Sequence, residues 1–153
     1  MVVSISSHAI APAVVLRGEG AWAEALFKIS ALCSRPLLLG RSQATSSLRA
    51  GLASDLLQSG LAPQAAELSY DCCEEDLQRL AAEAADCDAV LAAGGGKVLD
   101  AGKLLAHRLQ LPCITVPLSA ATCAGWTALS NLYSMHGAFK GDCLLYTSDA
   151  ADE

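Results

Sequence analysis

Three consecutive glycines followed by a lysine are this sequence's clearest candidate for chemistry. The glycines, residues 94–96, come directly after an apolar segment, 89–93, which has the composition of a buried strand. A helical pattern starts at once afterwards, and the apolar positions on its inner face are Val98, Ala101, Leu105 and Leu109. Ordering glycine backbone is entropically costly, so three in a row indicate a place where a bulky group must approach the main chain.

Phosphate is the group that suits this position. At the start of a helix, unpaired backbone N–H groups and the positive end of the helix dipole both favour an anion. Lys97 lies in the first helical turn, where a cation is disfavoured unless an anion is nearby. The pattern therefore predicts a phosphate-binding loop. The alternative is a tight strand-to-helix turn with a solvated lysine.

Two well-known phosphate loops do not match these residues. A P-loop needs glycine at position 91 and Ser or Thr at position 98, where this chain has Leu91 and Val98. The dinucleotide fingerprint G-x-G-x-x-G needs glycine at position 99, which is Leu99. What remains over residues 94–103 is the pattern G-G-G-K-x-x-D-x-x-K.

This pattern resembles the signature of the iron-containing alcohol dehydrogenase superfamily, and its lysine-bearing form is most similar to the glycerol dehydrogenase branch. In that family the glycine loop binds the pyrophosphate of a nicotinamide cofactor. The resemblance implies that NAD or NADP is bound here by Gly94, Gly95, Gly96, Lys97 and Asp100.

A second segment, residues 118–134, extends the resemblance. Its hydroxyl-rich start and its ending T-A-L-S-x-x-Y-S are similar to the part of the family that lies beside the nicotinamide. By resemblance, the residues facing the cofactor are Leu118, Ala121, Thr127, Leu129 and Tyr133, with Thr122 offering a hydroxyl group. Core packing and helix capping are the alternative roles for these side chains.

Two positions depart from the family pattern. Glycerol dehydrogenases carry a substrate-contacting aspartate where this chain has Cys123 on the substrate side, and a thiol cannot give a diol the same charge-assisted hydrogen bonds. Glycerol itself is therefore disfavoured as the substrate. After the second strand the family tends to have an acidic residue that accepts from the adenosine ribose. Here Arg41 and Ser42 follow, which could instead hold the 2′-phosphate of NADP, or Arg41 could be a solvated loop residue.

No metal site can be assembled from these residues. None of His8, His107 and His136 has a potential metal ligand three or four positions further on. The resemblance implies a catalytic zinc or iron held by an aspartate and two histidines of a helical C-terminal domain beyond residue 142. That metal acts as a Lewis acid on the alcohol whose hydride leaves for the nicotinamide. We therefore expect no catalytic residue within this chain.

The pattern of the elements predicts an α/β fold, doubly wound, with a mostly parallel sheet and helices on both faces. By resemblance this is a dehydroquinate synthase-like N-terminal domain. Strands are expected at 13–17, 36–39, 66–70, 89–93 and 113–116. Between them we expect a helix with Leu48, Leu52 and Leu56 facing inward, and a capping box of Asp71 and Glu74. Ligands of such sheets bind beyond the carboxyl ends of the strands.

Composition limits the remaining possibilities. Of 153 residues, 53% are hydrophobic and 17% charged, which indicates one folded domain. A net charge of −6 without a basic patch predicts no nucleic-acid partner, and no apolar run reaches the ~18 residues of a membrane span. The seven cysteines lack metal or redox spacing, which indicates a reduced, cytoplasmic protein. Cys33, Cys87 and Cys113 are expected in the core, and Cys72-Cys73 at a helix start.

The last eleven residues, 143–153, read like the translation of a transposase adapter used in sequencing libraries. We therefore expect residues 1–142 to be the cofactor-binding domain of an interrupted gene, 143–153 to be foreign and not packed, and the helical metal-binding domain to be absent.

The function these residues indicate is hydride transfer between an alcohol or polyol and NAD(P). The partner is a small-molecule alcohol, the full-length parent is expected to be a homo-oligomer, and the fragment alone is expected to be inactive. The alternatives are a dehydroquinate synthase-like sugar-phosphate cyclase and a non-catalytic nucleotide-binding domain.

Overall fold

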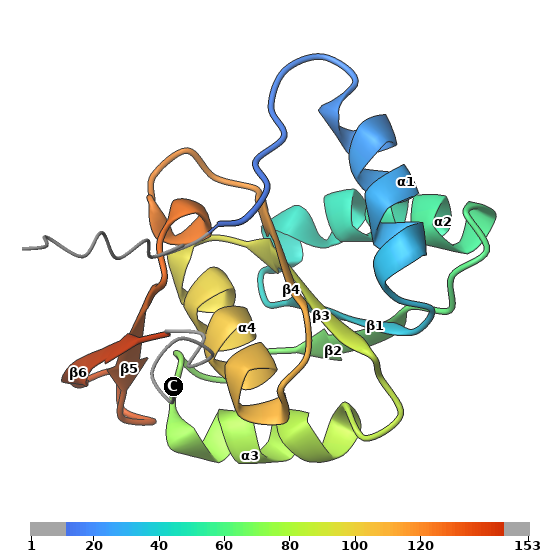
Figure 1. Cartoon of the computed structure of the whole chain (residues 1–153). Coiled ribbons are helices and arrows are strands. Elements are labelled where there is room, and N and C mark those ends of the chain that lie inside the picture. Colours follow the sequence, from blue (N-terminus) through green and yellow to red (C-terminus); the bar gives the residue numbers. More distant parts are fainter. Residues whose placement is uncertain (1–11, 146–153) are drawn as a thin grey trace, which may run out of the picture.

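The computed structural model describes residues 12–145, and a parallel four-stranded sheet lies at its centre (Figure 1). Its strands are β1 (Pro36–Gly40), β2 (Gln64–Glu67), β3 (Ala89–Gly94) and β4 (Cys113–Pro117). The strand order is β2-β1-β3-β4, and every neighbouring pair is parallel. The helices are α1 (Ala21–Leu32), α2 (Ser46–Gln58), α3 (Glu74–Glu83) and α4 (Gly96–Leu109).

Helices cover both faces of this sheet, because alternate residues of its central strands are apolar on both sides. In β3, Val90 and Ala92 belong to the core beneath α3 and α4. The intervening Leu91 packs with Ile29 of α1 and Leu56 of α2 in a second core. The predicted α/β doubly wound fold is confirmed.

A separate hairpin follows the sheet. Strands β5 (Leu129–Tyr133) and β6 (Phe139–Leu144) pair antiparallel after the short 3-10 helix η2 (Ala124–Trp126). The hairpin lies beside α4, away from the open sheet (Figure 1). It is tied to the loop before α3, because the Tyr133 N–H donates to the Cys72 carbonyl at 2.7 Å.

The predicted strand at 13–17 is wrong. These residues form no strand, and Val14 and Val15 are 61% and 45% exposed. A strand needs a partner, and among the described residues β1 is already paired on both sides. The weak prediction at 66–70 is shifted, because β2 ends at Glu67.

The inward face of α2 also differs from the prediction. Leu52 and Leu56 point inward as expected, but Leu48 is 54% exposed. Arg49, seven residues before Leu56, shares its helical face and is buried instead. Its guanidinium is held by the turn that precedes the helix, the 3-10 helix η1 (Gln43–Thr45).

The capping box before α3 does not form. Cys73 is the N-cap residue and makes no side-chain cap bond. The loop is instead organised by Asp76, whose carboxylate accepts from the Ser69 and Tyr70 N–H groups at 2.7 Å each. The Asp71 carboxylate is therefore available for other partners, which prove to be two cations of the candidate site.

The cysteines are all free thiols. Cys33 is buried as predicted and Cys72-Cys73 is buried at the start of α3, where burial raises the pKa of Cys72 to about 12. Cys87 is only half-buried, and the prediction for Cys113 is wrong: it is exposed because β4 is an edge strand among the described residues.

Strand β6 continues past residue 142. Cys143 and Leu144 lie opposite Ser130 and Leu129, and the Leu145 N–H donates to the Ala128 carbonyl at 2.8 Å. The expectation that this segment does not pack is therefore wrong for 143–145, while 146–153 lie outside the described residues. No helix within residues 12–145 has both the length and the apolar character to cross a bilayer.

Candidate functional site

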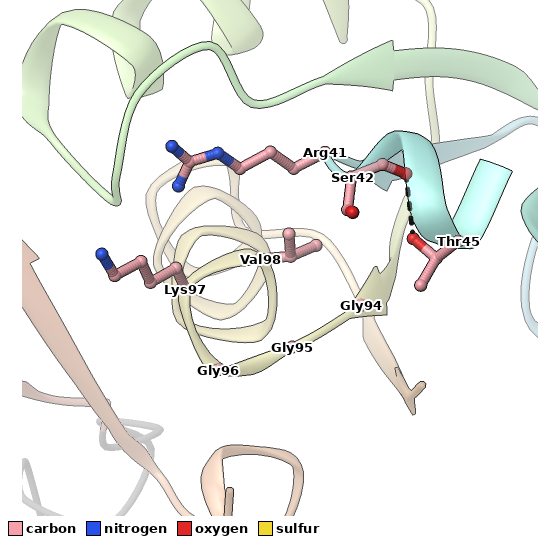
Figure 2. A pocket seen from close by; sticks show the side chains of 8 residues that line it. All are labelled: Arg41, Ser42, Thr45, Gly94, Gly95, Gly96, Lys97 and Val98. Carbon is pink, nitrogen blue, oxygen red and sulfur yellow. Dashed lines mark hydrogen bonds between the residues drawn. The ribbon is translucent and has the colours of Figure 1, made fainter. Parts of the chain in front are cut away.

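The candidate site is a pocket where the path of the chain through the sheet reverses. From β1 the chain continues to β2 on one side, whereas from β3 it continues to β4 on the other. The loops after β1 and β3 therefore separate at the carboxyl edge of the sheet and leave a crevice. This pocket has a volume of about 260 Å³ and is lined by Arg41, Ser42, Thr45, Gly94, Gly95, Gly96, Lys97 and Val98 (Figure 2).

The three glycines of this pocket are there for different reasons. A Cβ on Gly94 would lie 2.9 Å from the Val98 Cβ, and one on Gly96 would lie 3.0 Å from the Thr122 Oγ1. Both positions are therefore restricted by packing inside the protein. A Cβ on Gly95 would meet nothing within 4 Å. Gly95 alone keeps an open space clear in front of the loop.

Helix α4 starts at this open space. Gly95 is its N-cap residue in an extended conformation, with φ −86° and ψ −176°. The Val98 N–H donates to the Gly95 carbonyl at 3.1 Å, but the N–H groups of Gly96 and Lys97 have no carbonyl partner within the helix, and the helix dipole adds partial positive charge there. Gly96 and Lys97 therefore present backbone donors suited to an anion.

Two cations stand at the same rim, but they are not free. The Arg41 Nη1 and the Lys97 Nζ each lie 2.7 Å from a different oxygen of the Asp71 carboxylate. Their side chains extend in the same direction in Figure 2. The hydrogen bond from Lys97 and then that from Arg41 hold the pKa of Asp71 below its usual range. Lys97 also lies over the Tyr133 ring, 5.5 Å from its centroid. The protein itself thus supplies an anion for the lysine at the helix start.

The turn after β1 is fixed by a network of hydrogen bonds. The Thr45 hydroxyl donates to the Ser42 carbonyl at 3.1 Å (dashed line in Figure 2). Arg49 donates to the same carbonyl at 3.0 Å and to the Thr45 hydroxyl at 2.6 Å. The Arg49 guanidinium also occupies the space beside Gly40, because a Cβ built on Gly40 would lie 2.1 Å from the Arg49 Nε. Thr45 lines the pocket although the sequence pattern did not mark it as a site residue.

The segment predicted to lie beside the nicotinamide begins next to the glycine loop. The Leu118 N–H donates to the Gly94 carbonyl at 3.0 Å, and Thr122 lies against Gly96. Ala121 and Cys123 follow the same loop and are exposed. None of these four residues lines the pocket itself.

Asp100 was predicted to bind the cofactor, but it is not in the pocket wall and lies on the side of α4 that faces the hairpin. It is 6% exposed, and its Oδ1 is 3.2 Å from the Lys103 Nζ. Burial raises the pKa of Asp100, and the positive charge of Lys103 opposes this shift. Lys103 donates in addition to the Thr127 carbonyl at 3.1 Å and to the Leu129 carbonyl. The pair therefore ties α4 to the start of the hairpin.

The described residues offer no metal centre. Between residues 12 and 145, no three His, Cys, Asp or Glu side chains come together as potential ligands. His107 and His136 are exposed in different elements, and His8 lies outside the described residues.

Comparison with known proteins gives a consistent picture. The profile of the family described as iron-containing alcohol dehydrogenase matches residues 12–144. An uncharacterized oxidoreductase of Synechocystis sp. is 43% identical over 141 residues, which cover 91% of this chain and 36% of that protein. A glycerol dehydrogenase of Escherichia coli O6:H1 is 34% identical over 116 residues, 74% of this chain and 32% of that protein.

A solved structure shares the fold. The crystal structure of an iron-containing alcohol dehydrogenase superposes with a TM-score of 0.76 at 18% identity, over 93% of this chain and 45% of that chain. This chain spans about a third of the length of the two curated relatives.

Proposed function

Because this chain belongs to the iron-containing alcohol dehydrogenase family and is similar to its glycerol dehydrogenases, we propose that it forms the NAD(P)-binding part of an alcohol or polyol oxidoreductase. The complete enzyme transfers a hydride between the substrate and the nicotinamide. The named relatives are dehydrogenases or oxidoreductases, which favours this reaction over a sugar-phosphate cyclase and over a domain without catalysis.

The observation that carries the proposal is the open face of Gly95 at the start of α4, between two strand ends. The Gly96 and Lys97 amides can donate to phosphate oxygens, and within residues 12–145 no atom lies within 4 Å of where a Gly95 Cβ would stand. A volume of about 260 Å³ is smaller than most whole-ligand sites and suits a pyrophosphate with its adjoining ribose. The cofactor's remaining half would follow the exposed loop that begins at Leu118.

In this arrangement the hairpin side of α4 receives the nicotinamide half. Thr122 stands next to Gly96 and offers a hydroxyl group close to the pyrophosphate. Thr127 and Leu129 are held in position by Lys103, and Tyr133 by its contact with Lys97. These residues position the cofactor and do not themselves move a proton or hydride.

The polarisation of the alcohol belongs to a divalent metal, zinc or iron, which lowers the pKa of the bound hydroxyl group. Residues 12–145 do not fit such an ion. By the family resemblance we propose that its ligands belong to the helical domain of the complete enzyme. The chain alone is accordingly proposed to bind nucleotide without oxidising alcohols.

The substrate of the parent enzyme is proposed to be an alcohol or polyol other than glycerol. Cys123 is exposed at the loop where the family's glycerol dehydrogenases place an aspartate, and a thiol is a weak donor and acceptor. Kinetic assays of the complete enzyme with glycerol and with simple alcohols test this. A specificity constant highest for glycerol would contradict it.

The binding proposal is tested by calorimetry on the chain as it stands. ADP-ribose carries the pyrophosphate and adenosine does not, so ADP-ribose should bind with one-to-one stoichiometry and adenosine at least tenfold more weakly. Equal binding of the two compounds, or binding of neither, would overturn the assignment of the glycine loop to phosphate.

A further inference from the structure

We propose that Asp71 determines how strongly this pocket binds phosphate groups, and thereby its preference between NAD⁺ and NADP⁺; this rests on the dinucleotide site proposed above. Asp71 is not part of the pocket wall. It acts through Arg41 and Lys97, the two cations in that wall, and is therefore a specificity-determining residue that need not touch the cofactor.

Asp71 connects its own loop to two other segments at the carboxyl edge of the sheet. Arg41 comes from the turn after β1, Asp71 from the loop after β2, and Lys97 from the first turn of α4. Each carboxylate oxygen receives one cation at 2.7 Å. On the hairpin side, a Cβ on Gly137 would lie 3.4 Å from the Asp71 Oδ2. The carboxylate is therefore enclosed, with its side chain 13% exposed, while Arg41 and Lys97 are 38% and 50% exposed.

Asp71 places a carboxylate next to the pocket, whereas the loop after β1 has Arg41 and no acidic residue. Arg41 stands where the family tends to have an acidic residue, and by itself it favours the extra phosphate of NADP⁺. The neighbouring loop brings Asp71 onto the same guanidinium, which neutralises most of that advantage. A 2′-phosphate must compete with Asp71 for Arg41, whereas NAD⁺ has no group that needs to do so. The structure thus predicts a weaker preference for NADP⁺ than Arg41 alone would give.

The competing explanation is that Asp71 only ties the three loops together. The two roles predict opposite results when the charge is removed. Asp71→Asn keeps the size of the side chain and an oxygen that can still accept from one cation. If Asp71 is a structural tie, the variant binds both cofactors more weakly. If Asp71 offsets the positive charge of the pocket, the variant binds both more tightly and gains most for NADP⁺, which carries the extra dianion.

The experiment is calorimetric titration of the whole chain and of Asp71→Asn with NAD⁺, NADP⁺ and inorganic pyrophosphate at low and moderate salt. We expect Asp71→Asn to improve the affinity for NADP⁺ relative to NAD⁺ by roughly tenfold, because an unopposed charge-assisted bond to the 2′-phosphate is gained. The improvement should shrink as salt is added. In Asp71→Asn/Arg41→Met the relative gain should disappear.

Asp86→Asn is the matched control, because Asp86 is exposed at the amino end of β3, at the opposite edge of the sheet. It changes the net charge equally and should leave both affinities unchanged. A ratio of the two affinities that does not change in Asp71→Asn, or that favours NAD⁺, overturns the inference. If neither protein binds a dinucleotide, the proposed function fails. Tighter pyrophosphate binding by Asp71→Asn would then still support the role of Asp71, and equal binding would end it.

Discussion

Gly95 allows folding and ligand binding to be separated in one substitution. Its backbone is extended at φ −86° and ψ −176°, a conformation that alanine and valine adopt without strain, and a Cβ there meets no atom within 4 Å. Replacing glycine at such a position stabilises the folded chain by about 0.4–1 kcal/mol through the unfolded state. Alanine is a poorer N-cap residue than glycine, by roughly 0.5–1 kcal/mol, which offsets this gain. The free energy of unfolding of Gly95→Ala should therefore stay within about 0.5 kcal/mol of the parent.

Binding should change far more. A side chain at Gly95 projects into the space where a pyrophosphate must approach the α4 amides, and it prevents at least one charge-assisted hydrogen bond. Such a bond contributes about 1.5–3 kcal/mol, which corresponds to roughly 10- to 150-fold in Kd. Gly95→Val, with two further methyl groups, should weaken NAD(P) binding at least as much as Gly95→Ala.

The assay pairs urea unfolding with calorimetric titration of NAD⁺ or NADP⁺. Gly51→Ala is the matched control, because Gly51 lies in α2 with nothing within 4 Å of its missing Cβ. It should raise stability by up to about 1 kcal/mol and leave the affinity unchanged. If Gly95→Val binds the dinucleotide as tightly as the parent, the open face of Gly95 is not where the phosphates lie.

Three further predictions follow from the ion pairs. Lys103→Met leaves the Asp100 carboxylate buried without a cation and should lower the free energy of unfolding by about 3–5 kcal/mol, measured by urea unfolding. Much of this loss should be recovered in Asp100→Asn/Lys103→Met. If it is not recovered, the ion pair is not the cause of the destabilisation. Arg41→Asp should shift the ratio of the two cofactor affinities toward NAD⁺, and an unchanged ratio would make Arg41 a surface residue only. The folded-state pKa of Asp71 is lowered, so its contribution to stability is fully present above its unfolded pKa of about 3.9 and is lost as pH falls through the lower folded value. The difference in the free energy of unfolding between the parent and Asp71→Asn should therefore narrow below about pH 4. A constant difference from pH 6 to pH 3 would refute this.

Local patterns predict the interior of this fold well. The apolar runs at 36–39 and 89–93 become central strands because both faces of a parallel sheet are covered, and the glycines and Lys97 take the predicted place at the start of α4. The run at 13–17 is apolar at four of its five positions, but a strand forms only beside a partner, which local composition does not encode. Leu48 fits a helical stripe, yet Arg49 is drawn inward by oxygen atoms of a turn that the pattern does not describe.

The site was predictable where one segment supplies it and unpredictable where segments meet. The glycine loop is contiguous, so its place between β3 and the start of α4 could be predicted directly. Asp71 lies 30 residues from Arg41 and 26 from Lys97, and the three meet only because β2, β1 and β3 are neighbours in that order. Alternating strands and helices predict a parallel sheet without its strand order. Without the strand order, Asp71 was interpreted only from its local spacing to Glu74, which is typical of a helix cap.

The buried pair of Asp100 and Lys103 restricts how this motif can evolve. A mutation of either residue alone leaves an unpaired charge buried between α4 and the hairpin. A variant with only one of the two changes is therefore less stable than both the original chain and the double variant. Lineages should therefore keep both residues or exchange both together, while exposed neighbours such as His107 can drift singly. The spacing D-x-x-K then marks two positions, one turn of α4 apart, at which the residue tolerated at one depends on the residue at the other.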